Sequence, residues 1–277
     1  MSAKLNLNFY KGTDYYSDGE VEDDLLEIVK KTKDYSDVLF NDNRWPVLYH
    51  LSPIRQNIIN WYPFKKKSSI LEIGGGCGAI TGALCQSVNE VKVIELSKRR
   101  SVINYERHKG YENLEIIVGN LNDIKFNKKF DYITLIGVLE YAGSFTDTSE
   151  PYKDFLKNIK KYLKPSGKLI IAIENRYGLK YFAGAKEDHT GKEFDGITGY
   201  QGNNKVRTFG KKELENLLEE SGYRGQEFYY PHPDYKMPIE IYSQNFLPDV
   251  TSSLVQHLTL IANDMSCLMR LRNGKVL

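Results

Sequence analysis

The feature that most constrains the fold of this chain is a run of glycines directly after a short apolar segment. The apolar segment is SILEI at residues 69–73, and Gly74, Gly76 and Gly78 alternate with other residues behind it. An apolar run that ends in glycines and precedes a helical pattern is typical of a strand, a tight turn and a helix. Glycines at alternate positions let the backbone pass close to a ligand at the strand end. The motif therefore predicts a nucleoside-cofactor site.

The glycine motif by itself does not choose between cofactors. Gly74, Gly76 and Ala79 also fit the G-x-G-x-x-G/A fingerprint of dinucleotide-binding proteins. Glu95 and Leu96 end the second apolar run, about 20 residues beyond the first glycine, where a carboxylate can accept hydrogen bonds from both ribose hydroxyls. Such a carboxylate serves either kind of nucleoside cofactor.

Further apolar runs follow, and helical patterns lie between several of them. After SILEI they are VKVIEL (91–96), LEIIVG (114–119), FDYITLIG (130–137) and GKLIIAIEN (167–175). Strands that alternate with helices predict βαβ units and a parallel sheet. EFYYP and PIEIYS, separated by the turn-prone HPDYK, predict an antiparallel pair. We expect an α/β, Rossmann-like fold whose mostly parallel seven-stranded sheet has an antiparallel edge strand.

The organisation along the chain follows from the same patterns. Residues 1–67 contain helical spacing at 21–40 and 47–62, which predicts a helical N-terminal extension that covers the cofactor site. Residues 68–250 form the predicted Rossmann-like domain, with a glycine- and charge-rich insertion at about 175–208 for substrate specificity. Residues 251–277 are predicted to be a C-terminal helix or linker.

Composition limits the partners and the location. The 38 basic and 36 acidic residues leave a net charge of +2, too small a field to attract nucleic acid, so no nucleic-acid partner is predicted. The three cysteines have no metal-ligand spacing, so no metal site is predicted and a reducing compartment is expected. Because the N-terminus has no signal-peptide pattern and no segment approaches the roughly 20 apolar residues of a membrane span, we expect a cytoplasmic protein without a membrane span.

Several features near the glycines resemble class I S-adenosylmethionine-dependent methyltransferases. They are Glu72 before the glycines, the alternation that Gly78 extends, and the turn-strand LKPSGKLII, and the match covers about residues 69–175. The resemblance implies S-adenosylmethionine as cofactor, bound by residues that include Glu72 and the three alternating glycines. It also implies adenine contacts from Asn120 and Leu121, a plain loop-capping Asn120 being the alternative, and backbone contacts with the methionine half from the turn at Gly137.

Arg55, in the N-terminal extension, is a candidate partner for the carboxylate of the cofactor's methionine half, because arginine pairs with carboxylates through two parallel hydrogen bonds. A cation on a helix surface is the alternative interpretation.

Methyl transfer to a hydroxyl calls for a group that takes its proton. His189 is the favoured candidate, oriented by Asp188 or Glu187, and Glu140 at the end of the fourth strand is the second. A surface histidine and a helix-capping glutamate are the plain alternatives.

Three longer segments resemble a narrower family, the methyltransferase domains of bacterial surface-polysaccharide assembly, which are often fused to glycosyltransferases. The segments are residues 44–64, 174–200 and 228–243. This resemblance implies a sugar hydroxyl or other glycan acceptor, and fusion to or a complex with glycosyltransferases. One alternative is a methyltransferase whose acceptor is a small metabolite, a lipid or a protein. A second is an NAD-dependent oxidoreductase, although Tyr177 is followed at the fourth position by Tyr181 and not by the lysine of a Tyr-x-x-x-Lys pair. A third is a non-catalytic binding module.

Overall fold

The computed structural model describes residues 2–14, 16–202 and 205–247. In this part of the chain six strands form one parallel sheet in the order β1-β4-β3-β2-β5-β6. The strands are β1 (Lys4–Phe9), β2 (Ser69–Ile73), β3 (Glu90–Glu95), β4 (Leu114–Gly119), β5 (Phe130–Ile136) and β6 (Leu163–Ala172). This is the Rossmann-like arrangement that the alternating pattern predicts, so the fold class is confirmed.

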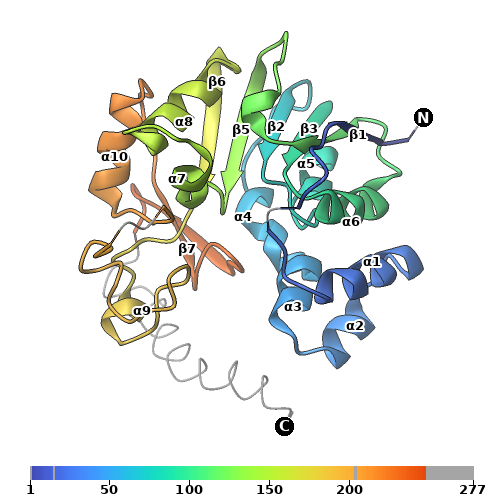
Figure 1. Ribbon diagram of the computed structural model, residues 1–277, viewed down its shortest axis with the longest axis horizontal. Helices are drawn as coiled ribbons and strands as arrows, with labels where there is room; N and C mark the ends of the chain where they lie inside the picture. The colour runs from blue at the N-terminus through green and yellow to red at the C-terminus, as the bar shows by residue number, and fades with distance from the viewer. Residues whose placement is uncertain (1, 15, 203–204, 248–277) are drawn as a thin grey trace.

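Helices cover both faces of the sheet (Figure 1). On one face α8 (Pro151–Lys160) and α10 (Lys211–Glu220) bury Leu156 and Leu214 against the strands. On the other face α5 (Thr81–Ser87) and α6 (Lys98–His108) lie against the sheet, with Leu84 of α5 fully buried. Central strands covered on both faces need apolar side chains on both, which explains the continuous runs that mark β2 to β5 in the sequence.

The first strand was not predicted, because residues 1–67 were expected to be helical. Lys4–Phe9 instead adds β1 to the edge of the sheet, parallel to β4, with Leu5 opposite Ile116. Its leucines and phenylalanine stand at every second position of KLNLNF, which is the period of a strand with one covered face. The run is short and contains two asparagines, so it lacks the apolar content of the central strands.

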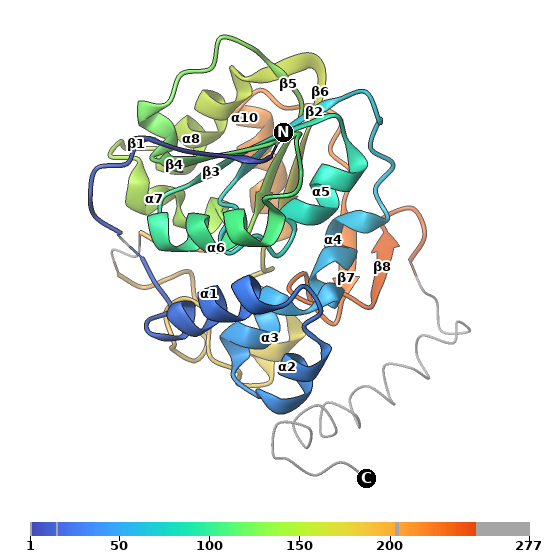
Figure 2. The same cartoon turned by 90° about the vertical axis from the view of Figure 1, so that its right-hand side faces the viewer.

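The helical part of the extension lies on the carboxyl-end side of the sheet (Figures 1 and 2). It consists of α1 (Val21–Lys31), α2 (Ser36–Asn41), α3 (Trp45–Leu51), the 3-10 turn η1 (Pro53–Gln56) and α4 (Asn57–Asn60). Leu25, Val29 and Leu51 share one buried cluster with Cys77 of the glycine loop and Ile103 of α6. The extension is therefore packed directly against the loop that follows β2.

The segments beyond β4 contain short helical turns and helices. The turns η2 (Leu121–Asp123) and η3 (Leu139–Tyr141) follow β4 and β5, and α7 (Ala142–Phe145) follows η3. After β6 the chain forms α9 (Leu179–Phe182) and a series of turns before α10.

The strands β7 (Tyr229–His232) and β8 (Glu240–Ser243) pair antiparallel, as predicted. They form a separate two-stranded sheet, however, so within the described residues the prediction of one seven-stranded sheet is corrected to six parallel strands plus this pair. The aromatic ring of Trp61, just after α4, lies 4.5 Å from that of Tyr229, and Asn57 donates a hydrogen bond to the carbonyl of Pro238. The pair is thereby fixed against the N-terminal extension, beside α4 (Figure 2).

The predicted C-terminal helix or linker at 251–277 lies outside the described residues. Among the residues that are described, none of the helices is long and apolar enough to span a membrane.

Candidate functional site

The glycine loop after β2 has two kinds of glycine. Gly74, Gly76 and Gly78 all have positive φ angles, of 77°, 50° and 78°. A Cβ atom on Gly74 would lie 2.4 Å from Cγ2 of Val138, and one on Gly78 would lie 2.4 Å from Oδ1 of Asn104. A Cβ on Gly76 would meet nothing within 4 Å. Gly74 and Gly78 are therefore required by packing within the protein, and Gly76 is the glycine that faces open space.

Glu95 lies next to this open position. Its Oε2 accepts a hydrogen bond from the backbone N–H of Gly76 at 2.8 Å, and its Oε1 accepts one from the N–H of Ser97 at 2.9 Å. Burial raises the pKa of Glu95, and these N–H groups act in the opposite direction. A carboxylate has about four lone-pair positions, so Glu95 retains acceptor capacity for the two hydroxyls of a ribose.

Glu72 turns away from the open side of the loop. It is 5% exposed, and its Oε2 accepts a 2.7 Å hydrogen bond from the hydroxyl of Thr81 on α5. Thr81 in turn accepts from Nδ2 of Asn104. Burial raises the pKa of Glu72 to about 7. In this geometry Glu72 joins β2, α5 and α6 beneath the loop.

Four other predicted cofactor residues lie at or near strand ends of the sheet, and they differ in burial and in hydrogen bonding. Asn120 accepts a 2.9 Å hydrogen bond from the N–H of Asn122 and so caps the turn η2. Leu121 is buried in the main core, and Leu96 is half-buried at the end of β3. Gly137 has a φ of 69°, and a Cβ there would lie 3.0 Å from the hydroxyl of Tyr235. Of these four, Gly137 is the one whose backbone conformation calls for glycine.

Arg55 is held by the protein itself. It is 2% exposed, and its guanidinium donates hydrogen bonds to the carbonyls of Tyr235 and Lys236 at 2.8 and 3.0 Å and to the hydroxyl of Tyr49 at 2.9 Å. Its Nε atom has no hydrogen-bond partner. Nη1 thus uses both of its N–H groups and Nη2 uses one, which leaves Nε–H and the second N–H of Nη2, so the pairing of Arg55 with a ligand carboxylate stays a prediction.

The turn after β5 buries a carboxylate that has an unused oxygen. Glu140 belongs to η3 and is 1% exposed, and its Oε2 has no hydrogen-bond partner. Burial, together with the nearby carboxylate of Glu174, raises the pKa of Glu140 to about 8. A buried polar atom that the protein leaves without a partner is uncommon and indicates a place for a ligand, a proton or an ion.

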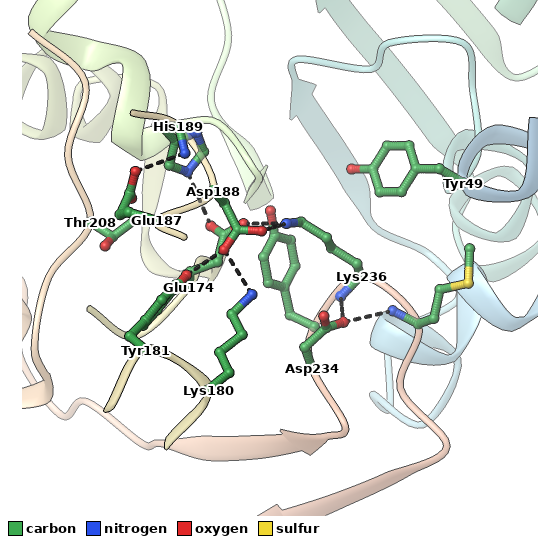
Figure 3. Close-up of polar contacts among 12 residues, drawn as sticks. Tyr49, Glu174, Lys180, Tyr181, Glu187, Asp188, His189, Thr208, Asp234 and Lys236 are labelled. Carbon is green, nitrogen blue, oxygen red and sulfur yellow. Dashed lines mark hydrogen bonds and ion pairs between the residues drawn. The ribbon is translucent and has the colours of Figure 1, made fainter. Parts of the chain in front are cut away.

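His189 lies beside Glu140, but its partners differ from those predicted. Its Nδ1 is 3.1 Å from the hydroxyl of Tyr141. Its Nε2 is 3.5 Å from Oε2 of Glu174 (Figure 3). Although burial acts against it, the charge of Glu174 raises the pKa of His189. The polar groups next to the imidazole in this structure are therefore those of Tyr141 and of Glu174, from the segment just after β6, and not the side-chain carboxylates of Asp188 and Glu187.

Asp188 and Glu187 have other contacts. Asp188 accepts hydrogen bonds from Lys180 at 2.7 Å and Lys236 at 2.8 Å, and also from the hydroxyl of Tyr181 (Figure 3). Glu187 accepts from the backbone N–H groups of His189 and Thr190. Asp188 thus belongs to a salt-bridge network, and Glu187 fixes the loop that carries the imidazole.

Two residues of this cluster were not predicted. Glu174 is 5% exposed, and its Oε1 lies 2.7 Å from Nζ of Lys236. Burial alone would raise the pKa of Glu174. The neighbouring His189 and Lys236 outweigh burial and hold this pKa below its usual value. Glu174 is the first residue of the segment 174–200, which resembles the surface-polysaccharide methyltransferases, and Lys236 lies in the turn between β7 and β8. The two residues are far apart in the sequence, so no local pattern predicts that they meet.

The structure therefore brings together a set of groups suited to binding a metal ion. One ligand atom from each of Glu140, Glu174 and His189 lies within 4.8 Å of the others. The three residues come from the turn after β5, from the segment after β6 and from the insertion, so their sequence spacing gives no sign of the arrangement.

Comparison with known proteins identifies the family of the chain. The profile of a family described as "Methyltransferase domain" matches residues 33–227, most of the chain. The chain belongs to this family, and the prediction of an S-adenosylmethionine-dependent methyltransferase is confirmed at the level of the family.

Individual relatives are distant. A ubiquinone biosynthesis O-methyltransferase of Rickettsia canadensis is 25% identical over 150 residues, which are 52% of this chain and 60% of that protein. An uncharacterized methyltransferase of Staphylococcus carnosus is 30% identical over 129 residues, 47% of this chain and 58% of the relative. The chain thus spans at most about three fifths of the length of these curated relatives. A solved structure of Haemonchus contortus phosphoethanolamine N-methyltransferase 1 matches 76% of this chain and 43% of that one, at 15% identity and a TM-score of 0.49.

Proposed function

We propose that this chain is an S-adenosylmethionine-dependent O-methyltransferase that acts on a hydroxyl of a glycan or sugar-containing small molecule. The observation that carries the cofactor part is the open face of Gly76 beside the buried carboxylate of Glu95, at the carboxyl ends of β2 and β3. In open α/β sheets this edge is where ligands bind.

The residues present fit the cofactor. Gly76 leaves room for close approach to the backbone, and Glu95 offers acceptor positions for two ribose hydroxyls. Gly137, with its positive φ, places backbone at the end of β5, where the methionine half is proposed to lie. When bound, S-adenosylmethionine supplies a methyl group on a positively charged sulfur that an oxygen or nitrogen lone pair can displace.

The chain's own contribution on the acceptor side is to position the hydroxyl and take up its proton. His189 is the proposed proton acceptor in the metal-free protein, since Tyr141 and Glu174 hold its ring in one orientation. Glu140 is the alternative, because its unpartnered oxygen lies in the same cluster. Asp188 is proposed to act only indirectly, through Lys236.

The proposed acceptor is a hydroxyl oxygen of a sugar. The relatives include proteins named ubiquinone biosynthesis O-methyltransferase and malonyl-[acyl-carrier protein] O-methyltransferase, which supports an oxygen as the acceptor atom. The resemblance of residues 174–200 and 228–243 to surface-polysaccharide methyltransferases supports a sugar hydroxyl and a partnership with glycosyltransferases. A small metabolite, a lipid or a protein is the alternative acceptor. The two described cysteines, Cys77 and Cys85, are buried and free, which fits the proposed cytoplasmic location.

Calorimetry tests the cofactor part directly. The purified chain is titrated with S-adenosylhomocysteine and, separately, with NAD. Saturable binding of the former alone supports the proposal, and binding of NAD alone would replace it with the oxidoreductase alternative.

Transfer of a labelled methyl group then tests the acceptor part and separates the enzyme from a non-catalytic binding module. Sugar nucleotides and lipid-linked glycans are compared with phenolic and carboxylate acceptors. In the same assay His189→Ala is expected to lower the single-turnover rate without changing the affinity for S-adenosylhomocysteine. An unchanged rate would remove His189 from the reaction.

A further inference from the structure

We propose that Glu140, Glu174 and His189 bind a divalent cation of the Mn²⁺ or Mg²⁺ type. The binding itself depends only on the geometry of this cluster, and its role in methyl transfer rests on the function proposed above. One ligand atom of each side chain lies within 4.8 Å of the others. Metal–oxygen distances of about 2.0–2.6 Å place opposite ligands roughly 4–5 Å apart, so the three groups can share one ion with small adjustments.

An independent observation is the unused oxygen of Glu140. This side chain is 1% exposed, and its Oε2 has no hydrogen-bond partner. A buried carboxylate oxygen without a donor is costly. A cation in the cluster would supply the missing partner.

The lysines near the cluster form ion pairs with Glu174 and Asp188 but not with Glu140. Lys236 lies between Glu174 and Asp188, and Lys180 also pairs with Asp188. In the described part of the chain no lysine or arginine forms an ion pair with Glu140, although the carboxylate of Glu174 is its close neighbour. A dication placed between these two carboxylates would offset their repulsion.

The surrounding residues already orient the ligands. Lys236 contacts Oε1 of Glu174, and the second oxygen, Oε2, is the one that faces His189 (Figure 3). The hydroxyl of Tyr141 contacts Nδ1 of His189, which leaves Nε2 on the side of the carboxylates. Outer contacts that fix the orientation of a ligating imidazole and carboxylate are typical of metal sites.

The type of ion follows from the donors. Two carboxylates and one imidazole, with no thiolate, suit Mn²⁺ or Mg²⁺ better than a structural zinc site, which is closed by four cysteine or histidine ligands. Three protein ligands also leave positions on the ion for an acceptor oxygen. A hydroxyl bound there would ionise more easily, so in the metal-bound protein the ion would promote loss of the proton to a solvent water, and the imidazole would serve as a ligand instead of as the proton acceptor.

The test is a titration of the purified full-length chain with MnCl₂, followed by calorimetry and by the loss of the electron paramagnetic resonance signal of free Mn²⁺. We expect one saturable site. Glu140→Gln and His189→Gln are each expected to weaken Mn²⁺ binding by at least about tenfold. The control is Glu193→Gln, an exposed carboxylate of the same insertion, which should bind Mn²⁺ like the wild type.

Absence of saturable binding, or binding that both cluster variants leave unchanged, would overturn the proposal. Circular dichroism and binding of S-adenosylhomocysteine on the same samples show that each variant is folded. These measurements also separate the two proposals, because a chain that binds Mn²⁺ but not S-adenosylhomocysteine keeps the metal site and loses the proposed function. The reverse result loses the metal site alone and leaves His189 as the proton acceptor.

Discussion

The backbone N–H of Gly76 donates a 2.8 Å hydrogen bond to Oε2 of Glu95. This contact joins the loop after β2 to the end of β3, the two neighbouring parts of the sheet edge that the sequence singles out. The carboxylate therefore has two tasks: it holds the loop in shape, and it is the proposed acceptor for the ribose hydroxyls.

Replacement of Glu95 should separate these tasks. Glu95→Ala removes both loop contacts and the proposed ribose acceptor, and hydrogen bonds to a charged group contribute about 1.5–3 kcal/mol each. We expect the affinity for S-adenosylhomocysteine to fall by roughly tenfold to a hundredfold. Glu95→Gln keeps the shape and one acceptor oxygen, so its loss should be smaller. Calorimetry with the three proteins decides, and unchanged affinity in the alanine variant would refute the ribose role.

Alanine should affect cofactor binding at Gly76 and folding at Gly78. Gly76→Ala adds a methyl group into open space, so the main cost to folding is the positive φ of 50°, about 1–2 kcal/mol. Affinity for S-adenosylhomocysteine should nevertheless fall, because the methyl group occupies the proposed site. Gly225→Ala is the matched control, since this glycine also has a positive φ and open surroundings but follows α10. It should lose similar stability and keep the affinity.

Gly78→Ala should instead affect folding. Its Cβ would lie 2.4 Å from Oδ1 of Asn104, whose Nδ2 holds Thr81 beneath the loop. Overpacking of this kind costs about 1–3 kcal/mol in addition to the strain of the positive φ. Chemical denaturation of Gly78→Ala and Gly76→Ala, side by side, measures the difference. Equal free energies of unfolding would contradict the assignment of Gly78 to packing.

Much of the fold was predictable because its signals are local. The central strands are buried on both faces, so each appears as a continuous apolar run, and KRRSVINYERH coincides with α6 at Lys98–His108. The single helix expected at 21–40 is interrupted, because α1 ends at Lys31 and α2 begins at Ser36. The side chain of Asp34 accepts hydrogen bonds from the N–H and hydroxyl of Ser36 in this interruption, a turn contact that competes with a continuous helix.

The candidate site was predictable only where one motif holds it. Gly76 and Glu95 follow from the strand ends, but the partner of His189 is Glu174, and the partner of Glu174 is Lys236 from the turn after β7. These contacts arise from folding of the insertion and of the β7–β8 pair onto the sheet edge. The sequence suggests Asp188 or Glu187 as the orienting group because both precede His189 directly, but Asp188 contacts Lys180 and Lys236, and Glu187 contacts backbone N–H groups of its own loop.

The buried Glu72 predicts a dependence of stability on pH. Its pKa is raised from 4.5 to about 7, so between these values the unfolded chain releases a proton that the folded chain keeps. The contribution of Glu72 to stability is therefore complete below pH 4.5 and is lost as the pH rises to about 7, by up to roughly 3 kcal/mol.

Glu72→Gln tests this dependence, since the amide keeps an acceptor for the hydroxyl of Thr81 but does not ionise. Relative to this variant, the wild type should lose stability steadily from pH 5 to pH 7 and no further at pH 8. Urea denaturation at each pH measures the difference. The exposed Glu219→Gln serves as control and should follow the wild type, and parallel curves for Glu72→Gln and wild type would contradict the prediction.

The contact between α1 and α6 depends on a buried ion pair. Nε of Arg100 on α6 lies 2.7 Å from Oε1 of Glu22 on α1, whose side chain is fully buried, and Nη2 of Arg100 lies 2.7 Å from Asp18. Arg100→Met leaves the carboxylate of Glu22 with the more distant Arg99, at 3.7 Å, as its cationic neighbour. Removal of one partner of a buried pair costs about 3–5 kcal/mol, whereas replacement of both by apolar groups is often nearly neutral.

A double-mutant cycle therefore distinguishes a buried pair from two independent contacts. Arg100→Met and Glu22→Leu should each lower the free energy of unfolding strongly, and the double variant should recover a large part of the sum because no buried charge is left unpaired. Urea denaturation of the four proteins gives the coupling energy, and additive losses would show that the pair does not hold α1 on α6. The helix α6 begins at Lys98, and the N–H of the preceding Ser97 donates a hydrogen bond to Glu95. A shift of α6 in the single variants should therefore disturb Glu95 and weaken the binding of S-adenosylhomocysteine. The double variant should regain part of that affinity.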